Sequence, residues 1–349
     1  MDATHHNKKS VFVILGAARS GTSVLARTLK TLGIHLGDKL LPPGKGNPTG
    51  FWEDTDIVYQ VNQQLLDQLQ FPWDSLKLLD PIYYANESCK VIEDVASQIL
   101  KNRVQEFSPW GFKDPRTVRV LPFWQSIFKK LELTDQYIIA LRNPLCSASS
   151  FLGDPTKKGL ERGLLLWLMH LVPAIENTHG KKRIIVSYEN IMQNPQKELG
   201  RLQQFFNLSF PTVNNIEEFT KIFLNQSLDH YRYSYDDLVS HPASNISPLI
   251  SQCYRLFLKL SNDEISFEDP EFLSTWIEIQ REFKNSYPAF CYIDKLILQN
   301  KQLERSYRAM QRSPSWKLIY PLRIIEKGLH LLKKYYRAHT TKKLENRLL

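Results

Sequence analysis

The stretch from Val11 to Leu29, VFVILGAARSGTSVLARTL, has the residue types of an anion-binding site. A short apolar run is followed by a turn with two glycines, Gly16 and Gly21, and then by a helical pattern. At such a junction glycines let the backbone approach an anion, and the amides that open the helix point toward it. The glycine spacing is that of the ATP-binding loop G-x-x-x-x-G-K-[ST], but Thr22 stands where that loop has lysine. The sequence therefore predicts an anion site that differs from an ATP-binding loop.

The side chains of this turn indicate which anion it suits. Arg19 supplies a cation three residues before Thr22, and Ser20, Thr22 and Ser23 supply hydroxyl groups. A guanidinium with several neutral hydrogen-bond donors suits an oxyanion that arrives without a metal ion, because the protein then provides both charge and hydrogen bonds. The turn favours a phosphosulfate over Mg-ATP, and we expect no metal here.

The pattern G-x-x-R-S-G-T-S after an N-terminal strand resembles the 5′-phosphosulfate loop of sulfotransferases that use 3′-phosphoadenosine 5′-phosphosulfate (PAPS). A second stretch, QYIIALRNPLCSASSFL at 136–152, combines a predicted strand with Arg142 at its end and Ser150 eight residues later. That spacing lets both side chains hold one phosphate. It also resembles the 3′-phosphate motif of the same family, an Arg-x-Pro followed by Ser. The resemblance implies that PAPS is the co-substrate, with Arg19, Ser20, Gly21, Thr22 and Ser23 on its 5′-phosphosulfate and Arg142 and Ser150 on its 3′-phosphate.

A carboxylate follows the loop 36–50, which is rich in Gly and Pro and cannot form a regular element. Transfer to a hydroxyl needs a base, and a carboxylate at the end of a mobile loop beside an anion site is well placed. We predict Glu53 as the base, with Asp54 and Asp56 as rivals. Glycan and tyrosyl sulfotransferases, which the chain resembles, often carry a catalytic Glu after the first helix. The alternative is an acidic residue that only stabilises a helix N-terminus.

A lysine ends the next predicted strand, in WGFKDPR at 110–116. Strand ends are where α/β folds place ligands, and Lys113 there can neutralise the charge that develops on a leaving phosphate, with Asp114 orienting it. K-D-P resembles a segment of tyrosyl and bacterial carbohydrate sulfotransferases whose lysine assists transfer. The alternative is a structural ion pair between Asp114 and either Arg116 or Lys113.

A third predicted strand, 183–187, leads into V-S-Y-E, which resembles the family segment whose tyrosine lies near the nucleotide. Tyr188 is therefore a nucleotide neighbour by resemblance, with core packing as the alternative. Ser227 and Arg232 are candidates for a late loop that closes the nucleotide site.

The length of 349 residues and 42% hydrophobic content allow one sizeable core with an appendage. We expect an α/β fold with a P-loop-type parallel sheet flanked by helices over residues 8–260. A helical extension with a short heptad-like stripe would follow at 261–312, and a basic amphipathic tail at 313–349. The N-terminus has no signal-peptide pattern and no run reaches the roughly 18 apolar residues of a membrane span, which favours a cytoplasmic protein.

The positive charge is confined to the C-terminal tail. The last 49 residues hold 13 Lys and Arg against 3 Asp and Glu, whereas the first 300 hold 32 basic and 33 acidic residues. A nucleic-acid partner is therefore not expected, while the tail suits an anionic membrane surface or a homo-oligomer. Its string S-P-S-W-K-L-x-x-P-L-R resembles the tail of bacterial glycosyltransferases that build surface polysaccharides, which suggests a glycan acceptor at the inner face of the membrane. The alternatives are a Mg-ATP kinase and a non-catalytic partner of a glycan assembly complex.

Overall fold

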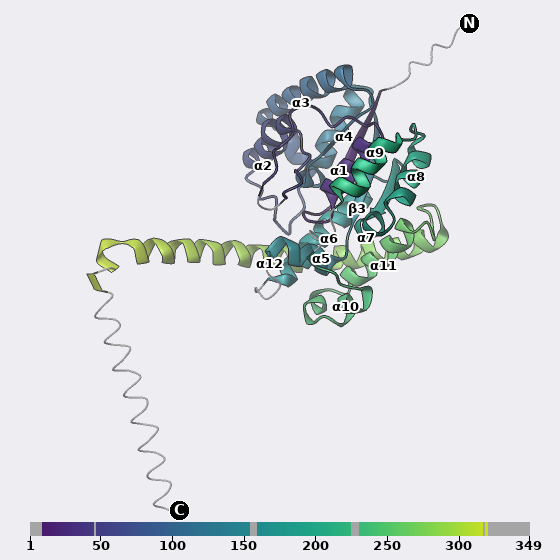
Figure 1. The fold of residues 1–349 in the computed structure, drawn as a ribbon. Helices are drawn as coiled ribbons and strands as arrows, with labels where there is room; N and C mark the ends of the chain where they lie inside the picture. The colour runs from purple at the N-terminus through teal and green to yellow at the C-terminus, as the bar shows by residue number, and fades with distance from the viewer. Residues whose placement is uncertain (1–8, 45–46, 154–158, 225–229, 317, 320–349) are drawn as a thin grey trace, which may run out of the picture. The chain divides into compact units, whose positions relative to one another are not determined.

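The computed structural model describes residues 9–44, 47–153, 159–224, 230–316 and 318–319 (Figure 1). The chain divides into two compact units, Met1–Phe290 and Cys291–Leu349. The long helix α12 (Pro270–Arg312) contributes to both units. The domain boundaries expected at 260 and 312 stay predictions, and most of the basic tail lies outside the described residues.

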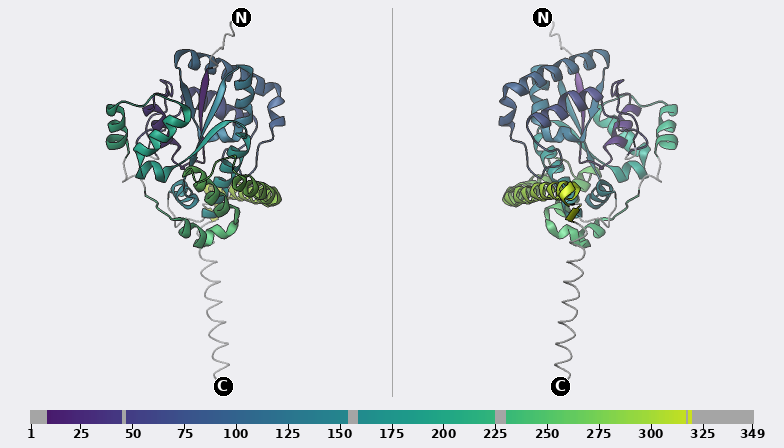
Figure 2. Two further views of the ribbon diagram at one scale, coloured as in Figure 1. Left: turned by 90° about the vertical axis from the view of Figure 1, so that its right-hand side faces the viewer. Right: turned by 90° about the vertical axis from the view of Figure 1, so that its left-hand side faces the viewer.

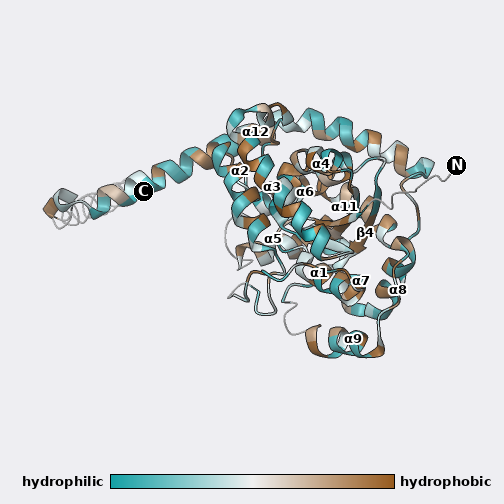
Figure 3. Cartoon of the chain, turned by 90° about the horizontal axis from the view of Figure 1, so that it is seen from above, coloured by the Kyte–Doolittle hydropathy of each residue, from teal (hydrophilic) through white to brown (hydrophobic). Residues whose placement is uncertain are grey.

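The first unit is built on a sheet of four parallel strands in the order β2-β1-β3-β4. The strands are β1 (Ser10–Leu15), β2 (Trp110–Lys113), β3 (Thr134–Leu141) and β4 (Lys182–Ser187). All four stretches were expected as strands from their apolar runs, and β4 is largely brown in the hydropathy colouring of Figure 3. The predicted α/β fold with a parallel sheet is confirmed.

Helices cover both faces of this sheet (Figure 2). Side chains alternate between the faces because successive residues of a strand point to opposite sides. Phe12, Ile14 and Ile138 share one buried cluster with Leu25 and Leu29 of the first helix. On the other face, Trp110 and Phe112 of β2 stack on each other, and the Phe112 ring contacts the rings of Trp124 and Phe128 of α4 in tilted arrangements. The α-helices of the first unit are α1 (Thr22–Thr31), α2 (Gln63–Gln68), α3 (Glu87–Glu106), α4 (Leu121–Lys130), α5 (Pro144–Leu152), α6 (Leu160–Asn177), α7 (Tyr188–Gln193), α8 (Pro195–Phe206), α9 (Val213–Glu217), α10 (Tyr235–Ser240), α11 (Leu249–Ser261) and the start of α12.

The helix expected around Val58 to Leu69 begins as a π-helix, η1 (Ile57–Asn62), before it continues as α2. The wider turn brings Asn62 into the interior, where it is completely buried. Its side-chain amide donates hydrogen bonds to Asp114 (2.9 Å) and Thr117 (3.0 Å), and its oxygen accepts one from the indole of Trp124 (2.8 Å). The π-helix thereby connects this segment to the end of β2.

The strand order places the ligand edge of the sheet. From β1 the chain goes to β2 on one side and then to β3 on the other, so the order reverses next to β1. In open α/β sheets ligands bind at the carboxyl ends of the strands beside such a reversal. The segments that follow β1, β2, β3 and β4 carry the residues predicted for the site.

Candidate active site

Three residues with positive φ angles, two glycines and one arginine, shape the turn between β1 and α1. Gly16 and Gly21 have φ of 151° and 85°, and Arg19 has φ of 68°. A side chain at Gly16 would lie 2.9 Å from the Cβ of Ala140, so β1 and β3 leave no room for one there. Helix α1 begins at Thr22 without a side-chain cap on its first amides. Among the described residues no side chain caps the N-terminus of this ten-residue helix, an arrangement that favours an anion.

The hydroxyl groups of the turn have different surroundings. Ser20 is buried and its hydroxyl donates to the carbonyl of Ala17 (2.6 Å). The Thr22 side chain is also buried at the start of α1. Ser23 donates to the carbonyl of Phe51 (3.2 Å) and accepts from the amide of Asn47 (2.9 Å). The loop before Glu53 is thus folded onto the anion-binding turn.

The two predicted phosphate motifs meet. The guanidinium of Arg19 donates through Nε to the hydroxyl of Ser150 (2.9 Å), and Arg142 donates through Nη1 to the carbonyl of Arg19 (3.2 Å). Burial and the neighbouring charge of Arg142 lower the pKa of Arg19. Two guanidinium groups this close repel each other and favour an anion between them.

Tyr188 lies between these motifs. The guanidinium of Arg142 sits 4.3 Å from the centre of its ring, and a Cβ at Gly21 would come within 2.5 Å of its Cδ2. The ring is therefore in contact with the anion-binding turn on one side and with the strand-end arginine on the other. These contacts agree with the packing expectation for Tyr188, and its role as a nucleotide neighbour stays a prediction.

Gly21→Ala should weaken nucleotide binding at least about tenfold, because an angstrom-scale displacement of positioned groups is costly. The new methyl would push the turn and the Tyr188 ring apart, and φ of 85° is strained for any L side chain. Calorimetric titration with 3′-phosphoadenosine 5′-phosphate measures the effect. Gly180→Ala is the matched control, since its φ is 71° but a Cβ there meets nothing within 4 Å. Equal affinity of the two variants would contradict the packing argument.

A pocket of about 430 Å³ opens beside Tyr188. Its wall includes Tyr231, Arg232 and Tyr233 from the segment before α10. That segment is held by β3: Arg142 donates to the carbonyl of Tyr231 (3.4 Å), and the Asn143 side chain donates to the carbonyl of Tyr233 (2.9 Å). Arg232 is exposed at the rim, whereas Ser227 lies outside the described residues.

The sequence analysis did not identify Glu189, which lines this pocket, or its partner Asn143. Glu189 accepts a hydrogen bond from the backbone amide of Asn143 (3.0 Å) and another from the hydroxyl of Ser187 (2.9 Å). It joins the ends of β3 and β4 below the pocket. The available signal was that Asn143 and Glu189 each follow the end of a buried strand in the same sheet.

Glu53 and Lys113 form a buried ion pair, with 2.6 Å between Oε1 and Nζ. Lys113 is 2% exposed and Glu53 7%. Burial raises the pKa of the Glu53 carboxyl, and the charge of Lys113 offsets part of that rise. The base and the cation predicted from separate stretches are therefore neighbours at the ligand edge of the sheet.

The two rivals of Glu53 are engaged elsewhere. Arg103 of α3 donates to both oxygens of Asp54 (2.7 and 3.3 Å) and to Asp56 (2.8 Å). Asp54 is 1% exposed and its side chain points away from Lys113 into this cluster. Neither carboxylate is paired with Lys113.

Asp114 has a structural partner. It accepts from the backbone amide (2.9 Å) and the Nε (3.0 Å) of Arg116 and caps the 3₁₀ helix η3 (Pro115–Val120). The structural ion pair weighed for Asp114 is thus present with Arg116. Lys113 is oriented by Glu53 instead.

Two histidines, His35 and His170, lie away from this site. His35 continues the sheet beside Trp110, at the opposite end of β2 from Lys113. His170 is completely buried in α6, and burial lowers its pKa to about 3. Neither is placed to take a proton from an acceptor.

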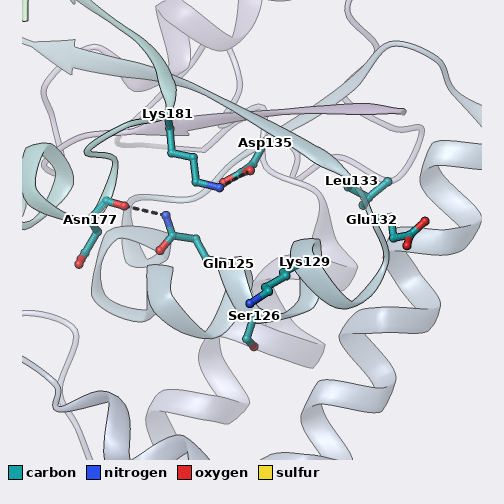
Figure 4. A pocket seen from close by; sticks show the side chains of 8 residues that line it. All are labelled: Gln125, Ser126, Lys129, Glu132, Leu133, Asp135, Asn177 and Lys181. Atoms are coloured by element: carbon teal, nitrogen blue, oxygen red, sulfur yellow. Dashed lines mark hydrogen bonds and ion pairs between the residues drawn. The ribbon is translucent and has the colours of Figure 1, made fainter. Parts of the chain in front are cut away.

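A second pocket, of about 570 Å³, lies at the opposite edge of the sheet (Figure 4). Lys181 pairs with Asp135 (2.8 Å) on its wall, and Gln125 donates to the carbonyl of Asn177 (2.7 Å). These residues surround the starts of β3 and β4. Because α/β ligands bind at the carboxyl ends of strands, this pocket is not the candidate site.

The described residues lack two features that would change this interpretation. They contain no group of three or more His, Cys, Asp or Glu arranged to hold a metal ion. Within the same residues, no helix combines the length and the apolar character needed to cross a membrane.

Comparison with known proteins gives one family match. The model of the Sulfotransferase family matches residues 11–212, more than half of the chain, and no curated protein matches. Among solved structures, the sulfotransferase domain of the Synechococcus PCC 7002 olefin synthase is similar at 16% identity and a TM-score of 0.39, covering 81% of this chain and 98% of that one. The sulfotransferase domain of the curacin biosynthetic pathway is similar at 16% identity and a TM-score of 0.36, covering 79% and 98%.

Proposed function

Because the chain belongs to the sulfotransferase family and is therefore an enzyme of sulfuryl transfer, we propose that it uses PAPS as the sulfuryl donor and a hydroxyl group as the acceptor. The observation that carries the proposal is the meeting of two phosphate motifs at one edge of the sheet. Arg19 bonds to Ser150, and Arg142 bonds to the backbone of Arg19. A nucleotide with phosphate groups at both its 5′ and 3′ positions fits such a pair.

The residues present fit this co-substrate. The start of α1, which has no side-chain cap, and the backbone of Gly21 suit the 5′-phosphosulfate, together with Arg19, Ser20, Thr22 and Ser23. Arg142 and Ser150 suit the 3′-phosphate. Tyr188 and the pocket beside it suit the nucleoside.

Glu53 and Lys113 divide the chemistry between them. The carboxylate of Glu53 takes the acceptor's proton as the acceptor oxygen forms its bond to sulfur. The bond from sulfur to the bridging oxygen breaks, and Lys113 neutralises the charge that this oxygen gains. The products are a sulfate ester and 3′-phosphoadenosine 5′-phosphate. Burial strengthens the effect of Lys113, since its ammonium is 2% exposed.

We choose Glu53 over Asp54 and Asp56 because of the side chains that each carboxylate contacts. Asp54 and Asp56 both accept hydrogen bonds from the guanidinium of Arg103, and neither is paired with Lys113. A base must reach the same oxygen that attacks beside the leaving group. Glu53, 2.6 Å from Lys113, meets that condition.

For the acceptor we propose a carbohydrate or glycolipid of surface polysaccharide assembly. The support is the sequence 313–323, which resembles the tail of glycosyltransferases in that process. The last 49 residues hold 13 basic and 3 acidic residues, an excess of 10 basic residues that supports a tail that binds an anionic membrane surface from the cytoplasmic side. A stripe of exposed side chains on α12, Leu296, Leu303, Tyr307 and Met310, supports self-association as the other role of this region. The family match favours sulfuryl transfer over the kinase and non-catalytic alternatives.

The test is a calorimetric titration of the full chain with 3′-phosphoadenosine 5′-phosphate and, separately, with Mg-ATP. We expect micromolar binding of the first and none of the second, since the lysine of an ATP-binding loop is replaced by Thr22. Preference for Mg-ATP would overturn the choice of co-substrate. A screen of saccharide acceptors with PAPS then tests the acceptor class, and transfer only to non-carbohydrate hydroxyls would overturn that part alone.

A further inference from the structure

Arg103 is the buried centre of an ion cluster, and it belongs to none of the motifs found in the sequence. It lies in the last turn of α3 and is 6% exposed. Its Nε and Nη2 grip the two oxygens of Asp54, and Nη2 also reaches Asp56. Its Nη1 lies 3.9 Å from Asp38. One guanidinium thus contacts both ends of the loop that leads to Glu53.

The segments that begin and end this loop, which we call the limb 37–41 and the limb 53–56, run side by side. The amide of Leu41 donates to the carbonyl of Glu53 (2.8 Å), and the amide of Thr55 donates to the carbonyl of Lys39 (2.8 Å). Gly37 leaves space for the cluster, since a Cβ there would lie 2.9 Å from an oxygen of Asp54. The limb that carries Glu53 is therefore attached to its partner limb and, through Asp54, to α3.

Glu53 and Asp54 point in opposite directions from this limb. Neighbouring side chains of an extended segment alternate, so fixing one fixes the other. Asp54 points to Arg103 and Glu53 points to Lys113. The residue before them, Trp52, has φ of 58°, which sets the direction in which the limb leaves the turn.

We propose that Arg103 is a positioning residue for Glu53: it holds Asp54 and Asp56 so that the neighbouring Glu53 carboxylate is kept on Lys113 at the transfer site. The proposal rests on the proposed function of Glu53 and Lys113. Arginine suits the task because its planar, rigid fork binds Asp54 through two nitrogens and reaches Asp56 at the same time, whereas an ammonium offers no such fixed fork. Its charge also neutralises carboxylates that would repel an anionic sulfuryl donor.

The first test reads the position of Glu53 through its partner and needs no turnover. In the native enzyme Lys113 is buried under Glu53, so an amine-reactive acetylating reagent should modify it slowly, as followed by mass spectrometry. In Arg103→Gln the limb loses its attachment, and we expect modification of Lys113 to accelerate at least about tenfold through local opening, with exposed Lys129 unchanged. Asp54→Asn, which keeps Asp56 on Arg103, should give a smaller gain.

The matched control is Arg201→Gln. Arg201 of α8 forms the same kind of two-pronged pair, with Asp263 (2.7 and 2.8 Å). It lies next to β4, which is the edge strand on the other side of the sheet from β2. It should leave Lys113 protected. The proposal is overturned if Lys113 is acetylated as slowly in both Arg103→Gln and Asp54→Asn as in the native enzyme. It is also overturned if the acetylation rate of Lys113 rises no more than that of Lys129.

The second test separates positioning from a purely structural role. With a saccharide acceptor found in the screen, Arg103→Gln should lower kcat about 10- to 100-fold with little change in the KM for PAPS, as expected for misplacing a base. In a Glu53→Gln background the same change should have almost no further effect, because residues that act as a unit are not additive. If the double variant lost kcat by the product of the two single-variant factors, the proposal would be overturned. Arg103→Lys, which keeps the charge without the fork, should recover only part of the rate.

These results are distinguishable from failure of the proposed function. If the native chain does not bind 3′-phosphoadenosine 5′-phosphate, the choice of co-substrate fails whatever the modification of Lys113 shows. If it binds the nucleotide and Lys113 stays protected in the variants, only the role of Arg103 fails.

Discussion

Glu53→Gln is expected to lower turnover by about 10²- to 10⁴-fold, the usual range for loss of a general base. Nucleotide affinity should stay within about twofold, because no phosphate contact is assigned to Glu53. Loss of a group that acts only in the transition state lowers turnover without weakening ground-state binding. The glutamine can still accept a hydrogen bond from Lys113, which limits the disturbance of the buried ammonium. Turnover is measured as release of 3′-phosphoadenosine 5′-phosphate with the saccharide acceptor, and affinity by calorimetry.

The chain offers a matched control for this change. Glu198 of α8 is also a buried glutamate with a raised pKa caused by burial, and it pairs with Arg201 (3.2 Å). Glu198→Gln should have an ordinary effect on stability and leave turnover near the native value. If Glu53→Gln is as active as Glu198→Gln, the base is another group, and Asp54 or Asp56 becomes the next residue to test.

The pH profile gives the same prediction a second readout. Only the anionic form of Glu53 takes a proton, so kcat should fall as pH drops below the carboxyl's pKa. Since burial raises the pKa of Glu53, this acid limb should lie above the ordinary range of a glutamate. Glu53→Gln should remove the limb from the residual activity. A limb that persists in the variant would assign it to a different group.

Arg142→Ala should weaken binding of 3′-phosphoadenosine 5′-phosphate about 10- to 100-fold, the value of a charge-assisted hydrogen bond of about 1.5–3 kcal/mol. Adenosine 5′-phosphosulfate, which has a 3′-hydroxyl, should lose much less affinity, because the guanidinium is assigned to the 3′-phosphate. Calorimetric titration of both nucleotides with native and variant protein measures the difference. Equal losses for the two nucleotides would show that Arg142 does not read the 3′-phosphate.

Arg183→Ala controls for the loss of a buried, ring-stacked arginine. Both arginines are 7% exposed, and Arg183 lies 3.9 Å from the centre of the Phe267 ring as Arg142 lies 4.3 Å from that of Tyr188. Arg183 is near the start of β4, away from the ligand edge. Its loss should reduce stability and leave the preference between the two nucleotides unchanged.

Much of this site is local in the sequence and could be predicted from it. The turn at Gly16 and Gly21, the arginine at the end of β3 and the lysine at the end of β2 each follow an apolar strand directly. Parallel strands end at one edge, so such residues converge without knowledge of side-chain contacts. The four strands were found for the same reason, since buried parallel strands read as continuous apolar runs.

The pairings that distinguish these residues could not be read from the sequence. Glu53 and Lys113 are 60 positions apart, and three neighbouring carboxylates gave no local reason to choose among them. The arginine that separates them, Arg103, sits in an amphipathic helix without a motif. Its one signal was indirect: the neighbouring carboxylates Asp54 and Asp56, the first of them buried, require a counter-charge.

The position of the Tyr188 ring has a consequence for how the nucleotide site can change. Gly21 contacts the ring from the 5′ motif, and Arg142 stacks on it from the 3′ motif. Any substitution that shifts the ring therefore displaces neighbours of both phosphates together. On the proposed assignment the two ends of the nucleotide site share one spacer, so a change at either end is transmitted to the other through the Tyr188 ring.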